Sequence, residues 1–420
     1  MSTAAVAAES ASDRRPVTAV LVANAVSLTG DALAAVAIPW FVLETTGSAA
    51  KAGLSGGIAV LPAFLAGIFG GTVVDRLGPK RASVVADVVG GTAILMIPLL
   101  YATVGLAFWQ LLALILLGGA LDVPGITARR AMLPELARFG GLRLERVNSI
   151  LEGNQQLAFL LGPPLAGVAI GVVGAERVLW ADAASFALSA GVVARMVPGR
   201  LYPRRERQAG VSYLDELRAG LSFLWHDRLL RAASLSLSVT NATGGAFFSV
   251  IYIVYARDRF DSATYVGLLF SAVGLGSLIG SIGFGAWGYR LPRRWIWATG
   301  YLTLPLGHWM FAGELPFPLM LAVLVVLAVL GGAINPLLVT VRMERIPPEM
   351  RGRVFATTSA IAMGMQPIGI VAGGALVEWV GLTRAVLILA AIEQAIGVVI
   401  FVQPIWQRLD DTRPDRSPST

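Results

Sequence analysis

The chain has 420 residues, of which 56% are hydrophobic and only 14% are charged, and it contains 47 glycines and no cysteine. Soluble globular proteins carry about 25% charged residues, so this composition indicates a protein surrounded largely by lipid. The lack of cysteine excludes disulfides and thiolate metal sites, and two histidines, His226 and His308, leave little material for metal or catalytic-triad chemistry. We therefore expect neither enzyme activity nor a bound metal or other cofactor.

Apolar segments that are long enough to cross a bilayer recur along the whole chain. A membrane-spanning helix needs roughly 20 mostly apolar residues. In the first half, such segments cover residues 18–42, 52–74, 82–103, 107–128, 149–172 and 177–197. In the second half, they cover residues 231–255, 264–288, 293–313, 317–341, 355–378 and 383–404. The sequence therefore predicts an all-α membrane protein with twelve transmembrane helices.

The distribution of basic residues predicts the orientation of these helices. With the N-terminus inside, only five of the 33 lysines and arginines fall in outer segments: Lys51, Arg177, Arg257, Arg259 and Arg384. Because cytoplasmic segments are enriched in lysine and arginine, we expect a multi-pass protein of the bacterial inner membrane with both termini in the cytoplasm. The net charge of +7 is then a signal of topology and not of nucleic-acid binding.

The longest polar stretch of the chain predicts its division into domains. It joins the sixth and seventh apolar segments, so we expect a first six-helix bundle over residues 1–200, a cytoplasmic linker over 201–228 and a second bundle over 229–420. Residues 213–225 within the linker have the composition of a short amphipathic helix on the membrane surface.

An ordered series of corresponding residues relates the two halves. Pro124 precedes Arg130 by six residues, and Pro336 precedes Arg342 by the same number. Further along, Arg146 corresponds to Arg353 and Pro163 to Pro367. The series indicates a duplication, and hence two pseudo-symmetric six-helix bundles. Duplicated halves of this kind hold the substrate near the bilayer midplane and work by alternating access.

The loop after the second predicted helix carries the most specific motif of the chain. It reads GTVVDRLGPKR and contains Gly71, Asp75, Arg76, Gly78, Lys80 and Arg81. A tight turn favours glycine at position 78, and the cations can anchor the loop at anionic headgroups. Every defining position matches the signature loop of the major facilitator superfamily, G-x-x-x-D-R-x-G-x-[RK]-[RK], which the chain therefore resembles. The resemblance implies the fold of that family and a gating loop, in which Asp75 contacts the N-terminal end of the eleventh helix and latches one conformation. A simple basic turn that only fixes topology is the alternative.

The fifth predicted helix contains Gly162, Pro163 and Gly167, which is similar to the glycine-proline motif of antiporters in that family. Proline removes a backbone donor and bends a helix, while small neighbours permit close packing. The resemblance favours export over import, although a kink without a transport role is an alternative. The chain lacks, between residues 111 and 119, the arginine that many family drug antiporters carry in the fourth helix.

An acidic residue near the middle of the first helix is the leading candidate for the transport site. Asp31 lies about thirteen residues into the predicted span, where a charge costs roughly 2.5–3.5 kcal/mol. Asn24 and Ser27 precede it by seven and four residues and share its face of the helix. We expect this face to line a cavity in which Asp31 handles substrate or protons; an interhelical hydrogen bond is the alternative.

Polar residues of three other predicted helices extend this candidate proton and substrate site: Asp122, Glu152, Gln155, Gln156 and Asn241. For Asp122 a structural ion pair with Arg129 or Arg130 is slightly favoured, and for Glu152 an arginine partner or the helix dipole is an equal explanation. We expect Asp182 at the outer interface of the membrane. Glu393 ranks below Asp31 because the twelfth helix is peripheral in the family that the chain resembles.

The sequence contains no GxxxxGK[ST] motif for ATP, so its energy source should be a gradient. We predict a proton-coupled exporter of small amphipathic molecules, such as drugs or a secreted metabolite. Its expected partners are the lipid bilayer, a small-molecule substrate and protons, with no nucleic acid, and we expect a monomer. The alternatives are a symporter that imports a nutrient and, less favoured, a sensor or assembly subunit of the same fold that transports nothing.

Overall fold

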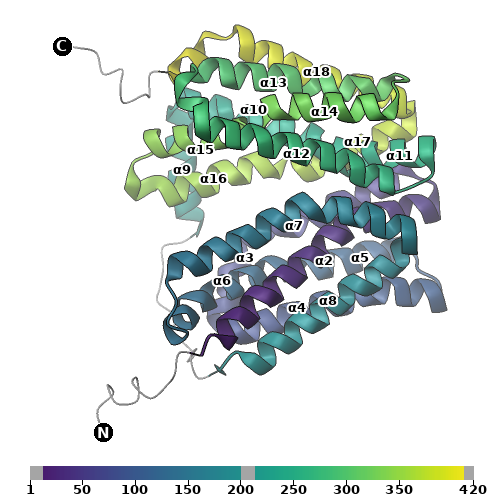
Figure 1. The fold of residues 1–420 in the computed structure, drawn as a ribbon, viewed down its shortest axis with the longest axis vertical. Helices are drawn as coiled ribbons and strands as arrows, with labels where there is room; N and C mark the ends of the chain where they lie inside the picture. Colours follow the sequence, from purple (N-terminus) through teal and green to yellow (C-terminus); the bar gives the residue numbers. More distant parts are fainter. Residues whose placement is uncertain (1–12, 200–212, 411–420) are drawn as a thin grey trace. The chain divides into compact units, whose positions relative to one another are not determined.

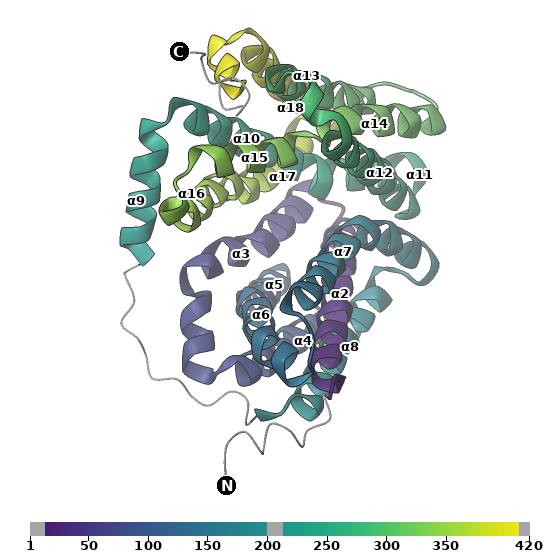
Figure 2. The same ribbon diagram turned by 60° about the vertical axis from the view of Figure 1, so that its left-hand side comes forward.

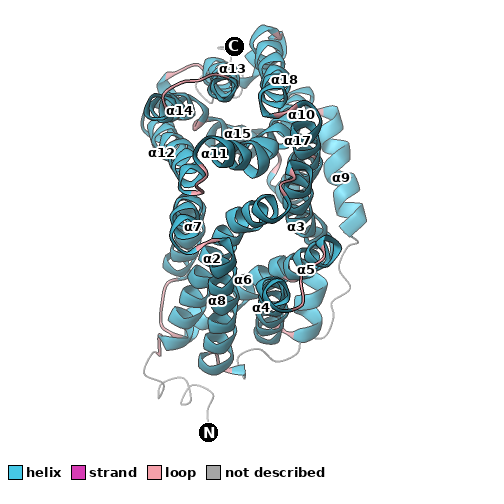
Figure 3. Cartoon of the chain, turned by 90° about the vertical axis from the view of Figure 1, so that its right-hand side faces the viewer, coloured by secondary structure: helices cyan, strands magenta, loops and turns pink. Residues whose placement is uncertain are grey.

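The computed structural model describes residues 13–199 and 213–410, and for residues 63–76, 213–217 and 289 it describes the backbone alone. All regular structure in these ranges is helical (Figure 3). The predicted all-α fold is thereby confirmed.

Two compact units make up the chain, Met1–Ile38 with Ile58–Ala209 and Pro39–Gly57 with Gly210–Thr420. The helices of residues 13–199 are α2 (Arg15–Thr46), α3 (Ala49–Leu77), α4 (Pro79–Thr103), α5 (Phe108–Ala120), α6 (Asp122–Phe139), α7 (Leu144–Val173) and α8 (Ala175–Met196) (Figure 1). In the first unit α4 packs against α6 and α8, and α2 lies beside α7 and α8 (Figure 2). This packing brings helices that are distant in the sequence around one core.

The second unit has shorter and more interrupted helices. They are α9 (Tyr213–His226), α10 (Arg228–Ala246), α11 (Tyr252–Phe260), α12 (Thr264–Trp287), α13 (Arg293–Trp309), α14 (Phe317–Gly331), α15 (Ile334–Arg345), α16 (Arg351–Gly364), α17 (Gln366–Val380) and α18 (Leu382–Val402). A π-helix, η2 (Phe247–Ile251), joins α10 to α11, and four 3-10 helices complete the unit: η3 (Gly288–Arg290), η4 (Met310–Ala312), η5 (Pro348–Met350) and η6 (Pro404–Leu409). The amphipathic segment predicted in the linker forms α9, which packs against α16.

Ten helices of the described chain are long and apolar enough to cross a membrane, and each coincides with a predicted span. The two remaining predicted spans correspond to α3 and α13, helices of 29 and 17 residues. The chain is therefore a multi-pass membrane protein, and the full count of twelve spans stays a prediction.

Corresponding helix breaks support the proposed duplication. The fourth predicted span is divided at Leu121 into α5 and α6, and the tenth is divided between Gly331 and Ile334 into α14 and α15. Pro124 is the third residue of α6, and Pro336 is the third residue of α15. Proline is tolerated in the first turn of a helix, where its missing N–H has no partner in any case. The two halves thus break the same helix at the same point.

The hairpin between α2 and α3 packs with the second unit. The chain reverses at Gly47, and beyond it the Oγ of Ser48 and the backbone N–H of Ala50 each donate to Oε2 of Glu378 over 3.2 Å. Glu378 belongs to α17, so this carboxylate anchors the hairpin there. Residues 39–57, which the sequence assigns to the first half of the chain, therefore belong to the second unit by packing.

Candidate functional site

A buried ion pair lies at the centre of the first unit. Nη1 of Arg129 on α6 is 2.9 Å from Oδ1 of Asp87 on α4, and the two side chains are 1% and 2% exposed. Ser189 on α8 donates to the other oxygen of Asp87 over 2.6 Å, and Nη2 of Arg129 lies 3.4 Å from the hydroxyl of Ser27 on α2. Side chains of α2, α4, α6 and α8 therefore meet at one guanidinium.

Helical periodicity explains why Arg129 is buried while its neighbour is not. The buried face of α6 includes Gly125, Met132 and Leu136, which are spaced three, four or seven residues from Arg129. Arg130 lies on the other face, where its side chain is 48% exposed and pairs with Glu152. Arg129 therefore occupies a core position of an amphipathic helix.

Three further carboxyl groups surround this pair. Asp31 interacts electrostatically with Asp122, Asp182, Arg129 and Asp87. Oδ2 of Asp31, Oδ1 of Asp122 and Oδ2 of Asp182 are buried and have no hydrogen-bond partner in the described part of the chain. We call Asp31, Asp87, Asp122, Asp182 and Arg129 the acidic cluster. If all its carboxyl groups were ionised, one positive charge would face four negative charges.

Two glycine contacts allow the helices around Asp31 to approach closely. A Cβ at Gly30 would overlap with Oδ1 of Asp182 and with the hydroxyl of Ser185, so the side chains of α8 reach α2 only because residue 30 is glycine. A Cβ at Gly162 would overlap with Ala32, which follows Asp31 in α2. Gly162 of the glycine-proline motif thus packs α7 against the helix that carries Asp31.

The acidic cluster is suited to binding protons or a cation. Buried carboxylates are tolerated when they are paired or hydrogen-bonded. Asp87 meets that condition, whereas the buried oxygens of Asp31, Asp122 and Asp182 have acceptor capacity without a donor among the described residues. A proton on a carboxyl group, or a positive charge beside it, would satisfy them.

The structure places the other predicted site residues of the first unit in two groups. Asn24 and Ser27 are buried on α2, and Ser27 reaches Arg129 of the acidic cluster. The polar residues of α7 lie elsewhere, because Nη2 of Arg130 donates to Glu152 and to Gln155 over 3.0 and 2.8 Å on an exposed face. Gln156 is exposed as well. The arginine partner considered for Glu152 is thus present.

Asn241 lies in the second unit, on α10. Its Nδ2 donates to the backbone carbonyl of Ala362 on α16 over 2.9 Å, and Ser238, one turn earlier, donates to Ile361 over 2.8 Å. These bonds tie α10 to α16.

The gating loop is described in part. For Gly71, Asp75 and Arg76 the structure describes the backbone alone. Gly78 precedes α4 with a φ of 77°, a conformation that glycine adopts without strain. Lys80 donates to the carbonyl of Ala194 in the last turn of α8 over 2.8 Å, and Arg81 is exposed.

One sequence-based expectation was wrong. Asp122 does not form the ion pair considered for it, because Arg129 pairs with Asp87 and Arg130 pairs with Glu152. Asp182 is 1% exposed and belongs to the acidic cluster, on a face of α8 that packs against α2. Its depth in the membrane stays a prediction.

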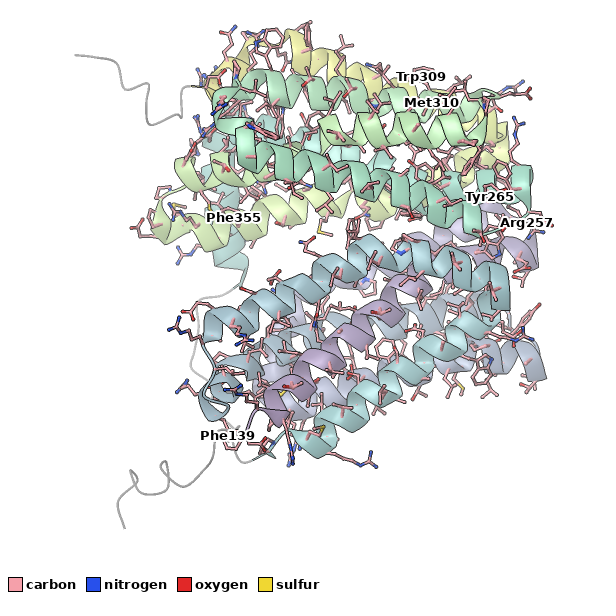
Figure 4. The ribbon with its side chains drawn as sticks, viewed as in Figure 1. Phe139, Arg257, Tyr265, Trp309, Met310 and Phe355 are labelled. Atoms are coloured by element: carbon pink, nitrogen blue, oxygen red, sulfur yellow. The ribbon has the colours of Figure 1, made fainter. Side chains whose placement is uncertain are left out.

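A second buried polar cluster, which the sequence did not reveal, lies in the second unit. Nδ1 of His308 on α13 is 2.5 Å from Oε2 of Glu393 on α18, and Thr243 on α10 is 2.5 Å from Oε1 of the same carboxyl group. All three residues are buried. Trp309 and Met310, labelled in Figure 4, follow His308 directly and mark the end of α13. We call these three residues, Thr243, His308 and Glu393, the histidine cluster.

Two helical units that cross a membrane repeatedly, each with charged or titratable groups in its interior, define a polytopic membrane transporter. The sequence profile described as Major Facilitator Superfamily matches residues 20–261 and 235–419, and the chain belongs to this family. The resemblance seen in the loop GTVVDRLGPKR is thereby confirmed. Within the described residues, no group of three or more histidine, aspartate or glutamate side chains is arranged to hold a metal ion.

Relatives extend over almost the whole chain. Multidrug efflux pump Tap of Mycobacterium tuberculosis is 32% identical and is aligned over 95% of this chain and 96% of its own length. Macrolide efflux protein A of Streptococcus pyogenes is 21% identical over 90% of this chain and 93% of its own length. Among solved structures, the nucleoside transporter NupG superposes with a TM-score of 0.72 at 13% identity, covering 92% of this chain and 98% of that one. The last similarity concerns the fold alone.

Proposed function

We propose that this transporter exports small amphipathic molecules, including drugs, from the bacterial cytoplasm and that protons drive the export. Efflux is supported by two relatives with full-length similarity, one a multidrug efflux pump and the other a macrolide efflux protein. Proton coupling rests on the acidic cluster, in which three buried carboxylate oxygens have no partner among the described residues.

The acidic cluster supplies a mechanism in which protons and substrate compete. In the protonated state, hydrogens on Asp31 and its neighbours satisfy the buried oxygens. When these protons leave toward the cytoplasm, the excess of negative charge around Arg129 attracts the positive end of an amphipathic substrate. Binding of new protons from the outside then displaces the substrate outward. Each proton that crosses supplies about 2.3 kcal/mol per 100 mV of membrane potential.

Arg129 and Asp87 have a different task in this mechanism. Their ion pair is closed by Ser189 and Ser27, so it holds α2, α4, α6 and α8 in place whether or not the other carboxyl groups carry protons. The positive charge of Arg129 also offsets part of the coulombic repulsion between the neighbouring aspartates when they are ionised. We propose Asp31 as the coupling residue because it interacts with all other members of the cluster.

The proposal extends to the architecture of the whole chain. The chain has twelve spans, and both termini lie in the cytoplasm of a bacterial cell. The spans form two six-helix bundles joined by a cytoplasmic linker, and the working unit is a monomer. Asp75 of the gating loop latches one conformation, and the glycine-proline segment bends α7 for alternating access. The bias of basic residues toward one side of the membrane supports the orientation.

Efflux from loaded vesicles tests the role of Asp31. We expect Asp31→Asn to abolish proton-driven efflux of a lipophilic cationic dye while exchange of dye across the membrane without a proton gradient persists. Glu152→Gln is the matched control, because it makes the same carboxyl-to-amide change in an exposed ion pair. Proton-driven efflux by Asp31→Asn at the rate of the unmodified protein would refute the assignment. Proton-driven uptake of the dye into the compartment that corresponds to the cytoplasm would support the importer instead.

A further inference from the structure

The hydrogen-bond geometry of the histidine cluster allows it to hold one proton more or one proton fewer. The hydroxyl of Thr243 lies 2.5 Å from Oε1 of Glu393 and 3.1 Å from the carbonyl oxygen of Val239 in its own helix. A hydroxyl has a single hydrogen to donate and can also accept. When Glu393 is ionised, Thr243 donates to the carboxylate; when Oε1 carries a proton, it donates to Thr243, which then donates to Val239.

The imidazole of His308 accommodates the same change on the other side of the carboxyl group. Nδ1 faces Oε2 of Glu393 at 2.5 Å, and a hydrogen placed between them can belong to either atom. A neutral histidine therefore donates to ionised Glu393, and a protonated one does so with a charge-assisted bond. The hydroxyl of Thr243, both carboxyl oxygens of Glu393 and Nδ1 of His308 therefore keep a hydrogen-bond partner with or without the additional proton.

Buried aromatic rings pack around the histidine cluster. The ring of Phe247 stacks on His308 with centroids 3.7 Å apart and planes 8° apart. Tyr252 and Phe311 close the aromatic group, with their rings 4.9 Å apart. Phe247, Tyr252 and Phe311 are all buried, so bulk water has no direct access to the carboxyl group through them.

The π-helix between α10 and α11 produces this arrangement. The N–H of Tyr252 bonds to the carbonyl of Phe247, five residues earlier, so that both rings face His308. In an α-helix, residues five apart point in different directions because each residue turns the helix by about 100°. Single π-helical turns occur often at functional sites. The irregular turn between α10 and α11 thus positions the aromatic rings that lie against His308.

Other titratable groups lie on α13 and α18 themselves, namely Arg293, Arg294, Tyr301 and Arg384, and on the elements packed against them. Tyr252 interacts electrostatically with Glu393. The packed elements α14 and η4 contain no titratable residue, and those of α10 and α17 are Arg228, Arg231 and Glu378. α15 and η6, which pack against α13, contribute Arg342, Glu344, Arg345 and Arg408, and α11 contributes Tyr255, Arg257, Asp258 and Arg259 beyond Tyr252.

We propose that His308 and Glu393, with Thr243 as an adjustable hydrogen-bond partner, form a proton-binding site in the second unit. The site takes up and releases a single proton beside the rings that the π-helix positions. It is additional to the acidic cluster, so each unit has its own proton-binding groups. Proton binding by this site does not depend on the proposed function, whereas the use of that proton to drive export rests on it.

Nuclear magnetic resonance of labelled histidine tests proton binding without any transport. The chain has two histidines, so the variant His226→Asn leaves His308 as the source of every imidazole signal. We expect its ¹⁵N signals in liposomes of defined lipid composition to change between two positions as the pH is varied over the range in which the protein stays folded. In the additional variant Glu393→Gln, which keeps the shape of the side chain, this change should disappear or move to a different pH. Signals that stay constant over the whole range, or a transition that Glu393→Gln leaves unaltered, would overturn the proposal.

Counting protons per exported dye molecule in proteoliposomes tests the use of this site. We expect Glu393→Gln to move fewer protons per exported dye molecule than the unmodified protein. An unchanged proton count together with a positive resonance result would refute the role in export and leave proton binding intact. Failure of export by the unmodified protein would instead count against the proposed function.

Discussion

The ion pair between Arg129 and Asp87 gives the sharpest prediction about stability. Replacing Arg129 by methionine keeps much of the volume and removes a charge that is 1% exposed. Asp87 then remains buried with Ser189 as its partner, and Asp31 and Asp122 lose the positive charge of Arg129. Removing one partner of a buried ion pair costs about 3–5 kcal/mol. At 1.4 kcal/mol per factor of ten, the folding equilibrium should fall about 100- to 4,000-fold.

The assay compares this variant with the adjacent arginine. Arg130→Met removes an ion pair whose side chains are 48% and 57% exposed, and such exposed pairs contribute about 0–1 kcal/mol. Equilibrium unfolding in mixed detergent micelles should therefore separate the two methionine variants by about 2–5 kcal/mol. Both variants change the same residue type in the same helix, so differences in helix propensity cancel.

A double variant isolates the pair itself. Arg129→Met combined with Asp87→Leu replaces both charges by apolar side chains, and such replacements of buried pairs are often neutral or stabilising. We expect the double variant to recover part of the lost stability, although not all of it, because Asp31 and Asp122 still lack Arg129. Equal stabilities for Arg129→Met and Arg130→Met, or a double variant less stable than Arg129→Met, would refute the reasoning.

Two further predictions concern glycines. Gly162→Ala should overpack against Ala32, which lowers the free energy of unfolding by about 1–3 kcal/mol and with it the thermal midpoint. In Gly153→Ala, in the same helix, the added methyl group meets no neighbour within 4 Å, so this control should not be destabilised. Equal midpoints for the two variants would contradict the close contact. Gly78→Ala forces an L-residue into a φ of 77° and a ψ of 150°, a region that is essentially restricted to glycine, and should cost about 1–3 kcal/mol in the same unfolding assay. A variant as stable as the unmodified protein would contradict the turn geometry.

The membrane architecture was accessible from the sequence because its signals are local. Apolar runs of about 20 residues mark the helices, and the loop GTVVDRLGPKR carries its motif in eleven consecutive residues. Asp31 was also identifiable, since a single acid in a long apolar run is conspicuous. Its face of α2, shared with Ser27, does contact the buried Arg129.

The acidic cluster was only partly predictable, because its members are joined by helix packing. Arg129 lies just after an apolar run and was therefore assigned to a cytoplasmic segment, but α6 continues to Phe139 with Arg129 on its buried face. Its spacing from Met132 and Leu136 was the available signal. Asp87 lies in the third predicted span and, like Asp31, is a lone acid in that span, so it was detectable by the same criterion.

The histidine cluster could not be predicted from local sequence. Its members are separated by 85 residues between His308 and Glu393 and by 150 residues between Thr243 and Glu393. No periodicity links positions on three different helices. The π-helix at Phe247 is equally hidden, since its sequence, FFSVI, is compatible with a regular helix.

The central claim is that protons and substrate compete for the acidic cluster. Proton release on substrate binding tests it most directly, in purified protein in weakly buffered detergent with a pH-indicator dye and a lipophilic cation such as tetraphenylphosphonium. We predict that the cation releases protons from the unmodified protein and from Glu152→Gln, and releases fewer or none from Asp31→Asn. Saturable binding of the cation to the unmodified protein without any release of protons would contradict the account.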